Sequence, residues 1–399
     1  MLALDRIYHA AYVLKGVARK TDLIAAPHLV SGMEDLYLKT ENLQVTGSFK
    51  LRGASYKISQ LPKRDLERGI IACSAGNHAQ GVALAATHMG VRSIVCMPDG
   101  APIMKVESTR RLGAEVRLVK GSYDDAHDEA VRLQEKTGAT LIHPYDDEDV
   151  ICGQGTIGLE IMDQLEGVDA VVVPVGGGGL ISGVACAVKS LKPSCQVFGV
   201  QAAGASAMAE SFRRGDWYAS DTASTFADGI AVKNPGEITF QMVRKYVDDI
   251  VTVSDDEIAA AILNLMERQK VVAEGAGAVP VAAAMFDKLP LAGKRVVCIV
   301  SGGNIDVNIL SRVINRGLAM SGRKVTMEIR LTDKPGQLQQ VSTIIAELGA
   351  NVVSVDYDLS DPDLPISSCT LRVGMETRDQ AQIDQIREKL VGEGFALVG

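Results

Sequence analysis

The sequence has few aromatic residues, no excess of positive charge and no long uninterrupted apolar run. Phenylalanine, tryptophan and tyrosine make up 4% of its 399 residues, and the formal net charge is -8. Proteins that bind nucleic acid normally carry a basic excess or stripe, so this charge disfavours a nucleic-acid partner and favours a small-molecule ligand. No stretch is long enough to cross a bilayer, and residues 1–6 lack a basic leader followed by an apolar run. We therefore expect a cytoplasmic protein with no membrane partner.

Closely spaced cysteine pairs are also missing. Seven cysteines are scattered along the chain without a Cys-x-x-Cys pair. Their spacing fits neither a zinc finger nor a disulfide framework. We expect most of them to be buried apolar thiols in a reducing compartment, and we expect no metal site.

Short apolar runs alternate with longer amphipathic segments over most of the chain. A length of 399 residues predicts two or three domains. Alternation of strands and helices at these lengths predicts parallel sheets with right-handed crossovers, and so an α/β fold. The predicted strands are residues 36–39, 70–73, 93–97, 115–119, 141–143, 170–174, 197–200, 250–253 and 296–300. The predicted helices include residues 78–89, 104–112, 124–136, 183–191, 237–246, 256–270 and 305–316.

The pattern changes after a linker at residues 321–323. Strands are predicted at 325–331, 351–358, 367–373 and 395–398, with helices at 338–348 and 380–390. This βαββαβ order predicts a ferredoxin-like sandwich, a fold that hosts many functions. We therefore predict a first domain over residues 1–321, with a smaller subdomain at about 49–145 inserted in it, and a second domain over 322–399.

One lysine occupies an unusual place in the sequence. In the stretch Thr46-Gly47-Ser48-Phe49-Lys50-Leu51-Arg52-Gly53, Lys50 lies between a small, hydroxyl-rich turn and the apolar start of a helix. Poor solvation destabilises the ammonium ion, lowers the lysine pKa and makes a neutral nucleophilic amine available. The stretch thus predicts a lysine that reacts with a carbonyl group. The alternative is a lysine that extends its charge to water from a half-buried helix.

Three predicted strands end in turns of small residues that open helices. These turns begin at Ser74, at Gly176 and at Ser301. Open α/β sheets bind ligands at the carboxyl ends of their strands. Glycine lets backbone amides approach an anion, and the helix N-terminus adds positive potential. We therefore predict a phosphate site at the glycine run, which comprises Gly176, Gly177, Gly178, Gly179 and Leu180.

The residues in and after this glycine run disfavour two common phosphate ligands. A dinucleotide site needs G-x-G-x-x-G and an acidic residue about twenty positions later. Here Ser182 occupies the third glycine position, and the next strand ends in Gln201 rather than an acid. No Gly-Lys-Ser/Thr follows a glycine loop, which disfavours a P-loop nucleotidase. A small monophosphate with a carbonyl that Lys50 can capture remains, and pyridoxal 5'-phosphate (PLP) has both groups.

The turns that begin at Ser74 and Ser301 could then bind the substrate and other parts of PLP. Ser74, Asn77 and His78, with adjacent backbone amides, could hold a substrate carboxylate, and the Asn77 amide could also bind the phenolic oxygen of PLP. Each could instead cap a helix. Ser301 would face the pyridine nitrogen, where a hydroxyl can leave the nitrogen neutral and weaken the electron sink. A weaker sink suits β-elimination.

Together these stretches resemble the fold-type II PLP enzymes, and within them the threonine ammonia-lyases. The likeness runs from about residue 8 to residue 318, and it includes Ala227-Asp228-Gly229 and Glu274-Gly275-Ala276-Gly277. It implies that PLP is bound by Phe49, Lys50, Asn77, Gly176 to Leu180, Gly229 and Ser301. It implies that the substrate is bound by Ser74, Ala75, Gly76, Asn77 and His78.

The tail resembles an ACT domain, a module that senses amino acids. Its D-x-P-G-x-L turn comprises Asp333, Pro335, Gly336 and Leu338, which the resemblance suggests as an effector site. A homo-oligomer of two or four chains and an amino-acid or nucleotide effector are implied in the same way. Isoleucine, valine and a nucleotide all remain open as effectors.

Serine racemase shares the fold and much of the lysine motif, but two positions depart from its pattern. Racemisation needs a second base, supplied by a serine before the Gly-Asn-His stretch, and Ala75 stands there. Gln201 stands where the racemase has a cation-site glutamate. Both departures favour elimination and put a divalent-metal site in doubt.

The resemblance implies deamination of L-threonine to 2-oxobutanoate and ammonia, in which Lys50 holds PLP and later removes the α-proton. L-Serine, which would give pyruvate, is the expected second substrate, because a pocket that accepts a methyl group cannot strongly exclude its absence. Such an enzyme serves either isoleucine biosynthesis or threonine catabolism. The alternatives are a serine dehydratase or racemase and, outside enzymes, an amino-acid sensor.

Overall fold

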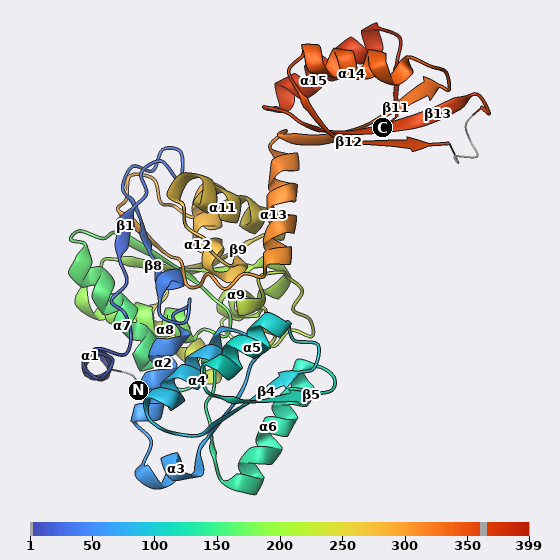
Figure 1. Ribbon diagram of the computed structural model, residues 1–399. Helices are drawn as coiled ribbons and strands as arrows, with labels where there is room; N and C mark the ends of the chain where they lie inside the picture. Colours follow the sequence, from blue (N-terminus) through green and yellow to red (C-terminus); the bar gives the residue numbers. More distant parts are fainter. Residues whose placement is uncertain (1–2, 360–364, 399) are drawn as a thin grey trace. The chain divides into compact units, whose positions relative to one another are not determined.

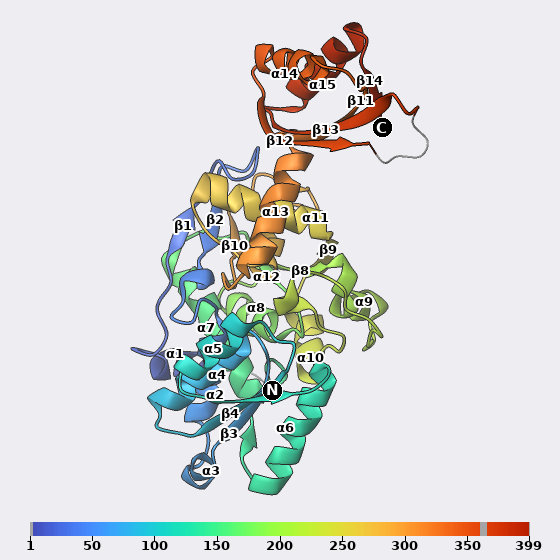
Figure 2. The same ribbon diagram turned by 45° about the vertical axis from the view of Figure 1, so that its right-hand side comes forward.

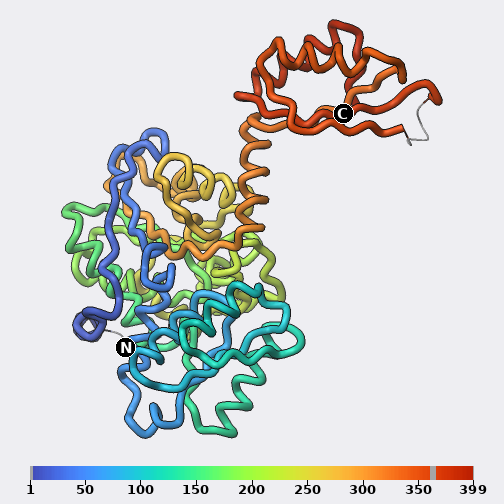
Figure 3. Tube along the Cα trace, in the orientation of Figure 1, coloured from blue at the N-terminus to red at the C-terminus, as the bar shows by residue number. Residues whose placement is uncertain are grey.

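The computed structural model describes residues 3–359 and 365–398. The chain divides into two compact units, Met1–Asp306 and Val307–Gly399, and the chain path through each can be followed in Figures 1 and 3. No helix of the described residues is long and apolar enough to span a membrane.

The larger sheet of the first unit has six strands in the order β1-β2-β10-β7-β8-β9. Only β1 is antiparallel to its neighbour, as the prediction of mostly parallel sheets requires. The strands are β1 (Leu23–Ala25), β2 (Leu36–Lys39), β7 (Ala170–Pro174), β8 (Gln196–Ala202), β9 (Asp249–Val253) and β10 (Val296–Ile299).

Helices cover this sheet, and successive side chains of one strand point to different layers. On β10, Val297 and Ile299 pack in the core formed with α7 (Glu148–Gln164), α8 (Gly179–Leu191) and α10 (Glu237–Tyr246). The thiol of Cys298 instead faces the Pro280 carbonyl on α12 (Gly275–Met285), at 3.6 Å. The strand residues are therefore buried on both faces, which accounts for the continuous apolar runs in the sequence.

The smaller sheet has four parallel strands in the order β5-β4-β3-β6. Alternate residues of β3 separate two cores: one contains α2 and α4, and the other contains α6. Figure 2 shows α6 beside this sheet. The elements are α2 (Lys50–Ser59), β3 (Ile70–Cys73), α4 (Asn77–His88), β4 (Ser93–Pro98), α5 (Ile103–Arg111), β5 (Glu115–Val119), α6 (Tyr123–Thr137) and β6 (Thr140–Leu141).

The second unit begins with helix α13 (Val307–Met320) and contains the predicted βαββαβ order. Its antiparallel sheet has the order β12-β13-β11-β14, which is the ferredoxin-like arrangement. The elements are β11 (Lys324–Thr332), α14 (Gln337–Glu347), β12 (Asn351–Asp358), β13 (Ser368–Glu376), α15 (Gln380–Gly392) and β14 (Ala396–Val398).

Several elements differ from the sequence prediction. Helix α12 was not predicted, because it is buried on all sides and has no polar face to create a periodic stripe. The helix predicted over 256–270 is an α-helix, α11 (Asp255–Asn264), followed by a π-helical turn (Leu265–Gln269) that ends where Lys270 adopts φ 58°.

Helices α1 (Leu4–Val13), α3 (Lys63–Arg68) and α9 (Ala207–Arg214) complete the first unit.

Candidate active site

Lys50 is the first residue of helix α2 and lines a cavity of about 550 Å3. Its Nζ donates a hydrogen bond to the Pro144 carbonyl at 2.7 Å and lies 5.3 Å from the centroid of the Phe49 ring. Burial disfavours the ammonium ion and lowers the Lys50 pKa to about 8, although the Glu274 carboxylate acts in the opposite direction. Lys50 therefore combines a nucleophilic amine with a cavity that can hold a ligand.

A buried ion-pair network fixes the start of helix α2. Arg52, two residues after Lys50, is 2% exposed. Its guanidinium donates to Glu41 at 2.8 and 2.9 Å and to Glu160 at 2.6 and 3.0 Å. Lys39 donates to the same Glu160 carboxylate at 2.6 Å. Because this network joins α2 to β2 and α7, it holds the backbone that carries Lys50.

The glycine run lines the same cavity as Lys50, although the two are more than a hundred residues apart in the sequence. Gly176 to Leu180 all border the cavity, and helix α8 begins at Gly179. Gly178 has φ 98°, a backbone conformation that favours glycine. A Cβ atom on Gly177 would lie 2.4 Å from the Tyr145 ring. The loop thus packs closely against Tyr145 and leads into the N-terminus of α8. Its backbone amides can therefore form a cradle for an anion.

The loop from Ser74 to His78 forms another wall of the cavity. The Ser74 hydroxyl accepts a hydrogen bond from the Gly76 amide at 3.1 Å, and helix α4 begins at Asn77. The Asn77 side chain donates to Glu274 at 2.7 Å, and its oxygen accepts from Asn304 at 2.7 Å. Asn77 is therefore fixed on both sides at the N-terminus of a helix, where an anion is favoured.

His78 faces a protein carbonyl. Its Nε2 donates to the Ile142 carbonyl at 2.9 Å, and the side chain is buried. Burial, together with the positive charge of Lys50, lowers the His78 pKa to about 3. His78 is therefore neutral at ordinary pH, and it offers a ligand no positive charge.

Glu274 is a buried carboxyl group in the cavity wall. Burial, and next the negative charge of Asp228, raise the Glu274 pKa to about 7, while the Asn77 hydrogen bond and the charges of Lys105 and Lys50 lower it. The sequence analysis used Glu274 only as part of a matching stretch. A carboxyl group whose pKa lies near neutrality in such a cavity is a functional candidate.

The remaining predicted cofactor residues also border the cavity. Ser301 is 2% exposed, and its carbonyl accepts a hydrogen bond from the Phe49 amide at 3.1 Å. Gly229 packs so closely that a Cβ atom there would lie 3.0 Å from Ala276 and 3.4 Å from Glu274. The structure thus brings to one cavity every residue that the sequence analysis assigned to PLP or to the substrate.

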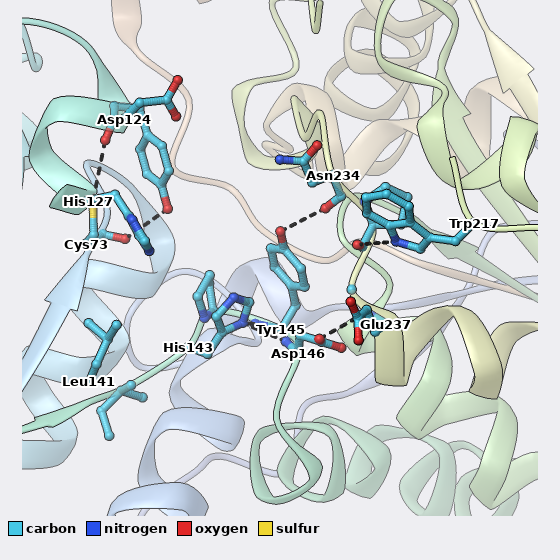
Figure 4. Close-up of a pocket in the computed structure, with 15 residues that line it drawn as sticks. Cys73, Asp124, His127, Leu141, His143, Tyr145, Asp146, Trp217, Asn234 and Glu237 are labelled. Carbon is cyan, nitrogen blue, oxygen red and sulfur yellow. Dashed lines mark hydrogen bonds between the residues drawn. The ribbon is translucent and has the colours of Figure 1, made fainter. Parts of the chain in front are cut away.

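A second cavity of about 380 Å3 adjoins the first and shares Tyr145 with it. In Figure 4, the Tyr145 side chain extends toward Asn234, and its hydroxyl donates to the Asn234 carbonyl at 2.9 Å. The backbone amides of Tyr145 and Asp146 donate to His143 Nδ1 at 3.3 and 2.8 Å. Tyr145 is therefore held in the wall that the two cavities share.

Tyr145 was missed in the sequence analysis. It follows β6, and the carboxyl ends of parallel strands are where side chains reach ligands. That position was a usable signal. By contrast, no local sequence pattern predicts the contact between Tyr145 and Gly177.

The predicted effector residues lie in the second unit, at the turn between β11 and α14. Gly336 has φ 93°, so the turn requires the glycine that the D-x-P-G-x-L pattern contains. The Asp333 amide donates to the Ser367 carbonyl at 2.8 Å. The turn is thus tied to the segment that precedes β13.

Gln201 is fully buried, and its side-chain oxygen accepts a hydrogen bond from the Ala209 amide at 2.7 Å. Among residues 3–359 and 365–398, no group of three or more His, Cys, Asp or Glu side chains could hold a metal ion.

The first unit has two open α/β lobes, one built around each of its sheets, which we call the larger and the smaller lobe. A buried lysine beside a glycine cradle at a helix N-terminus is typical of enzymes that attach a phosphorylated carbonyl compound through lysine. Residues 14–302 match the family of pyridoxal-phosphate dependent enzymes. The chain belongs to this family, and it is therefore a PLP-dependent enzyme of fold type II.

Relatives with assigned activities match most or all of the chain. An L-threonine ammonia-lyase of Thermotoga maritima is 51% identical over 397 residues, which cover 99% of this chain and 98% of that protein. The processed form of threonine deaminase isoform 2 from Solanum lycopersicum has a TM-score of 0.74 at 39% identity, covering 78% of this chain and 86% of that chain. Maize serine racemase has a TM-score of 0.74 at 34% identity, covering 80% and 98%.

Proposed function

We propose that this chain is a threonine ammonia-lyase, which converts L-threonine to 2-oxobutanoate and ammonia by α,β-elimination. The observation that carries the proposal is Lys50, whose amine faces the cavity that the glycine run and the Ser74–His78 loop also line. The 51% identity to an L-threonine ammonia-lyase over nearly the whole of both chains supports this reaction.

The residues present fit PLP. The cavity volume of about 550 Å3 falls within the range of small-molecule sites. Gly176 to Leu180 would hold the phosphate at the N-terminus of α8, while Phe49 and Gly229 would flank the ring. Asn77 would bind the phenolic oxygen, and Ser301 the pyridine nitrogen. When bound, PLP supplies an aldehyde for attachment and a ring that withdraws electrons from the substrate α-carbon.

The protein's own residues bind the substrate and remove its α-proton. The backbone amides of the loop from Ser74 to His78 bind the substrate carboxylate at the start of α4. As a neutral amine, Lys50 Nζ would remove the α-proton. The β-hydroxyl would leave as water with that proton, and hydrolysis of the resulting enamine would release ammonia and the keto acid. Ala75 offers no second base, so a proton is not returned to the opposite face of the α-carbon.

The same proposal extends to the second unit, to assembly and to location. We assign residues 322–399 to an ACT-type regulatory domain that binds an amino-acid or nucleotide effector near Asp333, Pro335, Gly336 and Leu338. The enzyme acts as a homo-oligomer in the cytoplasm. Support for the location comes from the seven cysteines, all of which are free and buried.

A keto-acid assay with a Lys50→Ala variant tests the function. The wild-type protein is expected to produce 2-oxobutanoate from L-threonine, and more slowly pyruvate from L-serine. Borohydride should abolish its visible absorption and fix the cofactor to Lys50. Lys50→Ala should lose at least about 10³-fold in kcat and lose covalent cofactor, because both attachment and proton removal need its amine.

The matched control is Lys57→Ala, which changes a lysine of the same helix that pairs with Asp147 and Asp149 outside the cavity. Full activity of Lys50→Ala would refute the mechanism. Chiral analysis of recovered serine separates elimination from racemisation, and a colourless wild-type protein without turnover would favour an amino-acid sensor.

A further inference from the structure

An ion pair crosses the active-site cavity between the two lobes. Lys105, on α5 of the smaller lobe, pairs with Asp228, on the 3-10 turn Asp228–Ile230 of the larger lobe. Both residues line the same cavity as Lys50. The Lys105 side chain is only 17% exposed, whereas that of Asp228 is 60% exposed, so the pair stands at the cavity rim and Lys105 is the more buried partner.

The turn that carries Asp228 lies directly against the cofactor cradle. The next residue, Gly229, packs on Ala276 and Glu274, and a Cβ atom on Gly176 would lie 3.1 Å from the Cα atom of Ile230. The position of Asp228 is therefore fixed by its own turn. A substrate bound in this cavity would therefore face a wall that includes this ion pair.

Charged groups on the other walls are already engaged or lie toward solvent. Lys50 donates to Pro144, and Glu274 accepts from Asn77. Asp124 and Lys233, which also border the cavity, are exposed. Lys105 is thus the half-buried cation best placed to meet an anionic β-substituent, and Asp228 occupies it.

We propose that the Lys105–Asp228 pair is a specificity determinant, which admits amino acids with a neutral β-substituent and rejects those that carry a second carboxylate. The inference rests on the proposed function, whose substrate class it narrows. Asp228 repels a second carboxylate and neutralises Lys105, the cation best placed to bind it. Loss of the Asp228 charge leaves Lys105 free for that carboxylate.

3-Hydroxyaspartate is the informative rejected substrate. It differs from threonine in bearing a carboxylate in place of the methyl group, and its elimination breaks the same bonds. Removal of the α-proton and the β-hydroxyl releases water, and hydrolysis then gives oxaloacetate and ammonia. No oxidant or further reactant is needed.

The test compares kcat/KM for L-threonine and L-threo-3-hydroxyaspartate in Asp228→Asn. We expect the ratio to shift toward hydroxyaspartate by at least about tenfold, because the variant removes a repulsion and releases a cation. Asp228→Glu should retain the wild-type preference, and the additional change Lys105→Gln in the Asp228→Asn background should abolish the gain. Asp163→Asn, which breaks the exposed Lys20–Asp163 pair outside the cavity, is the matched control.

A binding measurement makes the test independent of turnover. Calorimetric titration of the holoenzyme with succinate, a dicarboxylate that lacks an amine, should show at least about tenfold tighter binding in Asp228→Asn than in wild type. Butyrate should show no such gain. An unchanged substrate ratio together with unchanged succinate affinity would overturn the inference, as would a gain that persists without Lys105. A wild-type enzyme inactive on threonine would instead refute the proposed function, while the succinate titration would still decide the role of the pair.

Discussion

At the scale of single residues, the buried amine of Lys50 is the feature from which the chemistry follows. Its pKa is lowered to about 8, mainly by burial. Below pH 8 most of the amine is therefore protonated and cannot attack an aldehyde, whereas above pH 8 most of it is neutral. An ordinary lysine, with a pKa near 10.4, would reach this state about two pH units higher.

This difference predicts the pH dependence of cofactor capture by the apoprotein. The rate of PLP binding, followed by stopped-flow absorbance, should rise about tenfold per pH unit up to about pH 8 and then level off. Nα-acetyl-lysine, which keeps a free ε-amine, is mixed with PLP under the same conditions to correct for ionisation of the cofactor itself. A rate that continues to rise steeply to pH 9.5 would contradict the lowered pKa.

At the scale of secondary-structure elements, the cradle at the start of α8 depends on the absence of side chains. A Cβ atom at position 177 would lie 2.4 Å from the Tyr145 ring, much closer than van der Waals contact allows. The loop or Tyr145 would have to move, and Tyr145 is held by its hydrogen bond to Asn234. A single methyl group should therefore disturb the site more than the fold.

Gly177→Ala is expected to weaken PLP binding by at least about tenfold, corresponding to about 1.4 kcal/mol, as measured by equilibrium titration of the apoprotein. The matched control is Gly100→Ala, where no heavy atom lies within 4 Å of the added Cβ and the backbone needs no left-handed conformation. Affinity within twofold of wild type would show that the cradle tolerates displacement.

The elements were predictable from sequence to the extent that local patterns define them. Strand β2 and helix α10 have the predicted bounds, since their apolar residues recur at regular spacing and turns flank them. The three turns at Ser74, Gly176 and Ser301 were also found, because each follows a strand. Their residues do line one cavity.

What could not be predicted are contacts between residues far apart in the chain. Asn77 meets Glu274 across 197 positions, and Lys105 meets Asp228 across 123. No periodicity or turn signal encodes such pairs, since tertiary packing alone brings them together. Helix α12 was not predicted for a related reason, because its environment is apolar on every side.

At the scale of the whole molecule, the two compact units separate catalytic residues from the predicted effector turn. Every residue that lines the Lys50 cavity belongs to the first unit. The second unit has a core of its own, built from β11, β13 and the helices α14 and α15. Regulation by the second unit, as proposed above, can then be removed without removing the active site.

Truncation after Ser321 is accordingly expected to keep kcat for threonine within about threefold, because no cavity residue is lost. The response to an effector should disappear. Titration of both proteins with isoleucine, valine and nucleotides in the keto-acid assay checks this, with mass measurement in solution to follow any change in assembly. An effector curve that survives truncation would place the sensing site in the first unit.

The burial of all seven thiols also has a practical consequence. Burial raises the pKa of each of these cysteines, so thiolate formation, and with it alkylation, is suppressed throughout the native chain. A cysteine introduced at an exposed position such as Arg64, whose side chain is 80% exposed, would then react selectively. A fluorescent or spin label could be attached there, on the otherwise unmodified enzyme, to test whether the smaller lobe moves during turnover.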